Sequence, residues 1–276
     1  MKKQSVIRRI KPKYESTNAH SLSLGALTCG VALLMSTTAS ATIVFQGGSI
    51  NVAASWFDTD NGNATGTPAS GETATIAVDG TISATTTNFG NATVNHTAGT
   101  LTSSASGINL NFNGAGGTYN LQGGTLVLRG LQANGTGTTI NLESGLVRLG
   151  TTTNTGIGFG VNNGGTLNIS GSAVIESDRT ITNQFNTGTF DFASDWTGSF
   201  TVVDFENAGG FENLLQEFGA SVDGVAVDDT NFSDFFELSG PLAGGEFTTL
   251  TAAIPEPSSV ALLSLAGFGF LLRRRK

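Results

Sequence analysis

The chain has 276 residues and a formal net charge of −8 at pH 7. Its basic residues concentrate at the two ends, so residues 42–272 carry 20 acidic side chains against three arginines. A region with a net charge of −17 has no basic surface that could neutralise phosphates, which excludes nucleic acid as a partner.

Residues 1–41 have the order of parts that is typical of a secretory signal peptide. Six basic residues precede an apolar segment at 22–35, and the small residues Ala39 and Ala41 flank a cleavage site. We expect cleavage after Ala41. The only cysteine, Cys29, lies within the apolar segment, so we expect neither disulfides nor thiol chemistry in the mature chain.

Residues 42–72 are expected to form an N-terminal cap on the repeats that follow. The loop that starts Asp58-Thr59-Asp60 has the beginning of a calcium loop, but its twelfth position is Ala69 rather than glutamate. We therefore predict a turn held by Asx hydrogen bonds, and no metal site. With Trp56, Pro68 and the segment 71–76, this region resembles the first part of bacterial surface repeat proteins of the autotransporter-passenger type.

Residues 73–203 contain a repeat with a mean period of about 21.6 residues. Each copy begins with glycine, usually followed by threonine and an apolar residue, and then alternates polar with apolar positions, as a strand with one buried face does. A second short strand precedes several of these glycines. The repeat glycines are Gly80, Gly99, Gly124, Gly145, Gly165 and Gly188.

Two short strands per repeat, joined by turns rich in glycine and asparagine, predict an all-β fold. We expect a short parallel β-helix of about six stacked turns, because the spacing of similar units is nearly constant. The alternative is a β-sandwich built from antiparallel hairpins, which also uses short strands and glycine-rich turns.

The same pattern predicts a hydrogen-bonded column of amides on the outside of the β-helix. Asn95, Asn120 and Asn141 each lie four residues before a repeat glycine and between apolar residues. Equivalent positions stack at one strand spacing, about 5 Å, close enough for the amides to bond to one another. An isolated hairpin from Val94 to Leu101 would contradict this prediction.

Residues 204–252 interrupt the repeat with seven phenylalanines, ten acidic residues and no basic residue. The segment 211–218 has apolar residues at helical spacing. Because the open end of a β-helix exposes apolar side chains, we expect a C-terminal cap here, followed by a linker.

No catalytic group of residues stands out in the mature chain, and we expect neither an enzyme nor a cofactor. Its one histidine, His96, occupies the position of Leu121 and Leu142 in the next repeats, which predicts a wall residue rather than a base. The alternative is a β-helix enzyme that acts on polysaccharides. That enzyme would use a pair of acidic residues chosen from Glu176, Asp178, Asp191 and Asp195.

The end of the chain contains three parts in fixed order: Pro255-Glu256-Pro257, an apolar run at 258–272, and the basic residues Arg273, Arg274, Arg275 and Lys276. As a helix the run is about 22 Å long, so it spans a bilayer core of about 30 Å only if the arginines snorkel. The terminal charges predict that everything before Pro255 lies outside the cytoplasm.

This order of parts resembles the PEP-CTERM sorting signal of Gram-negative bacteria, and we assign residues 253–276 to it, with a transmembrane helix. The resemblance implies a partner, the exosortase, a membrane-embedded cysteine transpeptidase that cleaves near Pro255-Glu256-Pro257. The alternative is a C-terminal membrane anchor that stays uncut. We therefore expect an exported cell-surface or matrix protein, first anchored in the inner membrane, with a structural or adhesive role in an exopolysaccharide layer.

Overall fold

The computed structural model describes residues 42–60, 63–64, 66–83, 89–103, 109–111, 116–150, 157–177, 181–203, 210–240 and 247–253. The chain divides into two compact units, Met1–Thr38 and Ala39–Lys276, and all described residues belong to the second. The expected signal peptide and nearly all of the sorting segment therefore lie outside the described residues.

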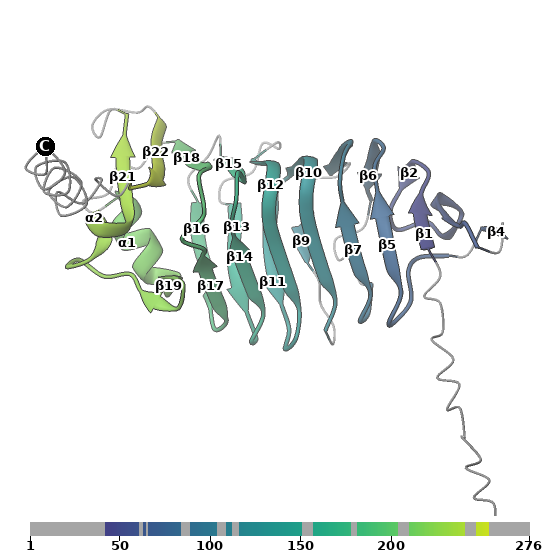
Figure 1. Ribbon diagram of the computed structural model, residues 1–276, viewed down its shortest axis with the longest axis horizontal. Coiled ribbons are helices and arrows are strands. Elements are labelled where there is room, and N and C mark those ends of the chain that lie inside the picture. The colour runs from purple at the N-terminus through teal and green to yellow at the C-terminus, as the bar shows by residue number, and fades with distance from the viewer. Residues whose placement is uncertain are drawn as a thin grey trace, which may run out of the picture. The chain divides into compact units, whose positions relative to one another are not determined.

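The described part of the chain is a parallel β-solenoid, which confirms the predicted fold class and excludes the β-sandwich (Figure 1). Its first sheet is parallel throughout. In spatial order this sheet contains β1 (Thr42–Phe45), β5 (Thr73–Ile76), β7 (Thr93–His96), the first half of β10 (Thr118–Leu128), the first half of β12 (Thr139–Leu149), β14 (Thr166–Ile169), β17 (Thr189–Phe192) and β19 (Ala220–Val222).

The second sheet begins where β10 and β12 bend and continue. It contains β2 (Gly48–Ser49), β6 (Gly80–Ile82), β8 (Thr100–Ser103), the second halves of β10 and β12, β15 (Val174–Ser177) and β18 (Ser199–Val203). Two antiparallel strands, β22 (Phe247–Ala252) and β21 (Phe236–Ser239), extend it at the C-terminal end.

A third sheet was not predicted. It contains β9 (Asn109–Asn111), β11 (Gly130–Asn134), β13 (Ile157–Asn162) and β16 (Ile181–Asn186), all parallel. Among the described residues, four turns therefore carry a strand in all three sheets, against the six two-stranded turns expected. None of these third strands contains a glycine–threonine step, so the repeat pattern did not mark them.

The predicted alignment of the last two repeats, which begin at Gly165 and Gly188, with the earlier ones was also wrong. The glycines at 99, 124 and 145 precede strands of the second sheet, whereas Thr166 and Thr189 pair with Thr139 and with each other in the first sheet. Both sheets place threonine outside and an apolar residue inside, so the same short sequence suits the start of either strand.

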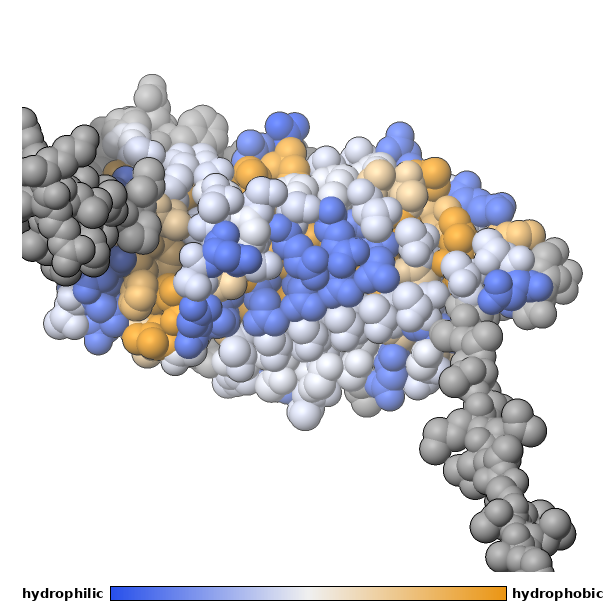
Figure 2. Space-filling view, viewed as in Figure 1, coloured by the Kyte–Doolittle hydropathy of each residue, from blue (hydrophilic) through white to orange (hydrophobic). Residues whose placement is uncertain are grey.

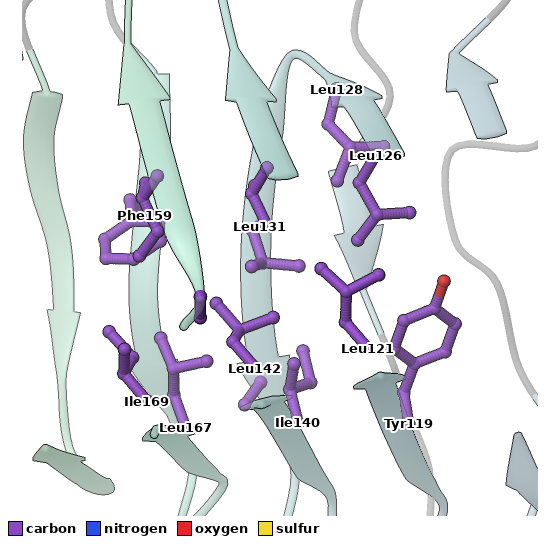
Figure 3. Close-up of a cluster of buried hydrophobic side chains, with 14 of the residues drawn as sticks. Tyr119, Leu121, Leu126, Leu128, Leu131, Ile140, Leu142, Phe159, Leu167 and Ile169 are labelled. Carbon is purple, nitrogen blue, oxygen red and sulfur yellow. The ribbon is translucent and has the colours of Figure 1, made fainter. Parts of the chain in front are cut away.

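The core lies between the three sheets, and Figure 3 shows side chains from each of them pointing into one interior. Tyr119 and Leu121 come from the first sheet, Leu126 from the second and Leu131 from the third, and none is exposed. Burial of each such side chain contributes about 1.5–3 kcal/mol, so the inward positions supply most of the driving force for folding.

Aromatic side chains close the two ends of this core. At the N-terminal end Trp56 is fully buried, donates from Nε1 to the carbonyl oxygen of Ile50 at 2.9 Å, and has its ring 5.1 Å from that of Phe45. Trp56 opens β3 (Trp56–Asp58), which follows the 3₁₀ helix η1 (Ala53–Ser55) and pairs with β1 and with β4 (Asn63–Ala64).

At the C-terminal end α1 (Gly210–Glu217) lies against β16 and β19, and so follows the third sheet. The predicted helix at 211–218 is confirmed to within one residue. Leu215 is fully buried, and the Phe218 ring lies 5.5 Å from that of Phe190 and 5.8 Å from that of Phe159. The chain then forms β20 (Val225–Ala226), which pairs with β19, and α2 (Phe232–Phe235).

The predicted amide column is present on the outer side of the first sheet. Asn120 pairs in register with Asn95 and with Asn141, so the hairpin alternative is wrong. Asn120 Nδ2 donates to Asn95 Oδ1 at 2.7 Å, and Asn141 Nδ2 donates to Asn120 Oδ1 at 2.7 Å. The column continues one step further than predicted, because Asn168 Nδ2 donates to Asn141 Oδ1 at 2.8 Å.

Removal of an amide from the middle of this column should cost more than removal from its end. Asn120→Ala breaks two side-chain bonds and Asn95→Ala breaks one. At about 1 kcal/mol for each bond, we expect losses in the free energy of unfolding of about 2 and about 1 kcal/mol. Urea unfolding of the two variants measures the difference. Equal losses would mean that the amides bond to water and do not support the register.

Candidate functional site

The outer side of the first sheet is the most regular surface in the described part of the chain. Threonine begins seven successive strands, and each threonine pairs in register with the next. Two residues further along, the four asparagines form the amide column. We call this surface the threonine–asparagine face, made of Thr42, Thr73, Thr93, Thr118, Thr139, Thr166, Thr189, Asn95, Asn120, Asn141 and Asn168.

Every side chain of this face is half-buried or exposed. In Figure 2 a blue hydrophilic band runs across the stacked strands, with a paler band beside it. The threonine column and Asn168 were not predicted as parts of a surface. A Thr-x-Asn sequence at 93, 118, 139 and 166 marks them, because it places both polar side chains on one side of a strand.

The outer side of the second sheet is less uniform. Arg148 pairs in register with Glu176, and its Nε lies 2.9 Å from the Glu176 carboxylate. Both side chains are exposed, so this ion pair adds little to stability. Arg148 thus lies on the solvent side of its strand.

The acidic residues considered for an enzyme have local partners instead of a shared cleft. Glu176 is on the second sheet and binds Arg148, whereas Asp191 is on the first sheet and accepts from the Ser221 hydroxyl and from Gly224 N at 3.0 Å. Asp195 accepts from Gly171 N at 3.4 Å. Asp178 lies outside the described residues.

The Asp58–Asp60 loop forms the Asx turn that was predicted. Asp58 Oδ1 accepts from Asp60 N at 2.9 Å, and Asp60 Oδ2 accepts from Thr42 N at 3.1 Å. The Asp60 carboxylate therefore ties the loop to the start of β1. Among the described residues, no three histidine, cysteine, aspartate or glutamate side chains gather as a metal ion would require.

His96 is a fully buried wall residue, paired in register with Leu121. Its Nε2 lies 3.1 Å from the carbonyl oxygen of Gly99, and its Nδ1 lies 2.8 Å from Tyr119 Oη. Because a carbonyl oxygen only accepts, Nε2 carries the proton, and Nδ1 accepts from the tyrosine hydroxyl in the neutral ring. Burial lowers the pKa of His96 and raises that of Tyr119, which favours this neutral pair.

A hollow of about 290 Å³ lies in the C-terminal cap, lined by apolar side chains and the two carboxylates of Asp223 and Asp234. Ala253 also lines it and donates from its backbone N to the Phe235 carbonyl oxygen at 2.8 Å. The last described strand is therefore tied to the cap immediately before the sorting segment begins.

The predicted site residues at the chain ends lie outside the described residues. These are Ala39 and Ala41, the motif Pro255-Glu256-Pro257, the apolar run at 258–272, and Arg273–Lys276. The signal peptide, its cleavage site and the transmembrane helix therefore stay predictions. Of the helices in the described part of the chain, none combines the length and the apolar character needed to cross a bilayer.

Comparison with known protein families identifies one segment. Residues 253–276 match the PEP-CTERM protein-sorting motif, the same residues that the sequence pattern assigned to a sorting segment. This motif implies recognition by an exosortase and an exported protein that is anchored by its C-terminus before processing. No curated protein and no solved structure matches the chain.

His96 should make stability depend on pH. Its pKa is lowered in the folded state, so the unfolded state binds more protons as the pH falls from about 7 to about 5. Stability is fully present above the unfolded pKa and is lost as the pH falls toward the folded one. It is the only histidine in residues 42–276, so His96→Leu should flatten this part of the profile. Urea midpoints across this range test it, and an unchanged slope in the variant would contradict it.

Proposed function

We propose that the protein is processed by an exosortase and then acts as a structural or adhesive component of an exopolysaccharide layer at the cell surface. The single observation that carries the proposal is the sorting motif at 253–276. It follows a solenoid body whose last strand is tied to the cap at Ala253, next to Pro255-Glu256-Pro257. In the sequence, the proposed cleavage motif begins two residues after Ala253, close to the end of the folded body.

The character of the body supports a role that is structural and not catalytic. Its regular faces come from side chains that stack and bond to one another, as the Asn120–Asn141 pair does. The described candidates for a catalytic acid, Glu176, Asp191 and Asp195, are each held by a partner on a neighbouring turn. An acidic surface with few basic residues keeps such a protein soluble outside the cell.

Processing predicts a shortened C-terminus. In cells that contain the exosortase, we expect the mature protein to lack the apolar run at 258–272 and Arg273–Lys276. Replacement of Pro255, Glu256 and Pro257 by alanine should block this cleavage while membrane insertion continues, because the apolar run is unchanged. Mass spectrometry of the native C-terminus measures both results.

Ser258→Ala with Ser259→Ala is the matched control, because it changes adjacent residues and leaves the motif intact. The control should be processed like the wild type. Recovery of wild-type protein with its arginines intact would reduce the segment to a plain membrane anchor.

An adhesive role predicts that polysaccharides retain the protein without being cut. We expect purified exported protein to be held by at least one polymer in a panel of neutral and acidic glycans. The chain length of each polymer, measured by size-exclusion chromatography, should stay unchanged, because the candidate acids Glu176, Asp191 and Asp195 are each bonded to a local partner and share no cleft. Shortened polymer would favour the polysaccharide-active enzyme, and no retention by any polymer would contradict the adhesive role.

A further inference from the structure

The threonine–asparagine face is a regular, uncharged lattice of hydrogen-bonding groups. Its seven threonines lie in one column and its four asparagines in a second, two residues further along each strand. Within the described part of the chain, no hydrogen bond joins these threonine hydroxyls to another side chain. The hydroxyls are therefore available to a ligand that covers the whole column.

The amide column supports the register of this lattice. Sheets of many strands normally twist, and flat ones are stabilised by ladders of identical side chains. The bonds from Asn120 to Asn95, from Asn141 to Asn120 and from Asn168 to Asn141 are 2.7, 2.7 and 2.8 Å long, so the side-chain bonds between successive turns are nearly equal in length. The adjacent threonine column takes the same regular spacing, because both columns are on the same strands.

The dimensions of this lattice resemble those of ice. In a tetrahedral water network with O···O hydrogen bonds of about 2.75 Å, two oxygens bonded to one water are about 4.5 Å apart, and the repeat along the hexagonal axis is about 7.3 Å. Neighbouring threonines are about 4.8 Å apart, and a threonine and an asparagine two residues apart on one strand are separated by about 6.6 Å. Along the threonine column, the spacing of about 4.8 Å exceeds the ice spacing of about 4.5 Å by about 0.3 Å per turn. Over six steps this difference adds up to about 1.8 Å, less than half of the ice spacing of about 4.5 Å.

We infer that the threonine–asparagine face binds the surface of ice. Ice presents no net charge, and a charged side chain at the contact would have to lose its hydration shell at a large cost. The eleven residues of the face include no charged side chain, although residues 42–272 as a whole have a net charge of −17. Glu143, two residues after Asn141 on β12, follows the asparagine column, and its carboxylate accepts from Gln122 Nε2 at 3.1 Å. The first carboxylate in the asparagine column is Asp191, which lies at its C-terminal end.

Each threonine contributes two groups to such a contact. Its methyl group excludes disordered water from the face, and its hydroxyl both donates to and accepts from a water in the ice lattice. The outer side of the second sheet is a poor surface for ice, because Arg148 and Glu176 project from its middle. The two sheets therefore supply a candidate surface and a control surface in one molecule.

The test introduces two protruding side chains on one face or the other. Thr118→Tyr with Thr139→Tyr places them on adjacent strands of the threonine–asparagine face. Thr100→Tyr with Thr125→Tyr, also paired in register and half-buried, places them on the second sheet. Tyrosine favours strands, so both variants should fold, which circular dichroism and thermal unfolding check.

Inhibition of ice recrystallisation and thermal hysteresis, measured with purified exported protein, give the readout. We expect activity in the wild type, loss of it in Thr118→Tyr with Thr139→Tyr, and retention in Thr100→Tyr with Thr125→Tyr. Absence of activity in the wild type overturns the inference, and so does an equal response of the two folded variants.

A second measurement does not depend on the folding of either variant. Fluorescently labelled wild-type protein is offered to a growing single crystal of ice. We expect it to enter the crystal on particular planes, since the face matches only some of them. Complete exclusion of the label from the ice overturns the inference.

Discussion

In-register stacking of equivalent side chains is the constraint on which the rest of this structure depends. In a parallel solenoid each residue lies above its equivalent in the previous turn, at about 4.8 Å. Apolar residues such as Leu121 and Leu142 therefore stack inside, and Asn120 and Asn141 stack outside. The amides tolerate this because each one donates to its neighbour below and accepts from the one above. A charged residue in the same column would repel its equivalents, so the regular part of the face is neutral.

The same stacking creates two ends that need different chemistry. An end turn has no neighbour on one side, so its apolar side chains and strand edges would face water. Trp56 closes one end, and the Phe190–Phe218 contact with α1 closes the other. His96 and Tyr119 show that the interior also accepts a polar pair, provided that each polar atom finds a partner. Irregular sequence is thus confined to the caps, and repetition to the middle.

Localisation and surface chemistry are separate properties of this chain. The sorting motif at 253–276 implies an exported protein that an exosortase recognises, and it begins where the cap holds Ala253. The body contributes faces of different character: a neutral lattice of hydroxyls and amides on the first sheet, and the Arg148–Glu176 pair on the second. An extracellular role that depends on contact with an extended surface is consistent with both properties, since a face with repeated groups binds through many weak contacts at once.

The sequence by itself determined the local patterns: the sorting motif, the alternation that predicted a β-solenoid, the Asn95–Asn120–Asn141 column, the helix near 211–218 and the Asx turn at Asp58. Each of these depends on spacing between near neighbours, which a single sequence displays. Only the tertiary structure decided which repeats stack on which. A glycine–threonine step starts strands in two different sheets, so the sequence aligned Thr166 with strands of the second sheet although it belongs to the first. The strands of the third sheet contain no glycine–threonine step that could mark them. The seven-threonine column follows from that alignment, because it exists only where successive turns meet in register.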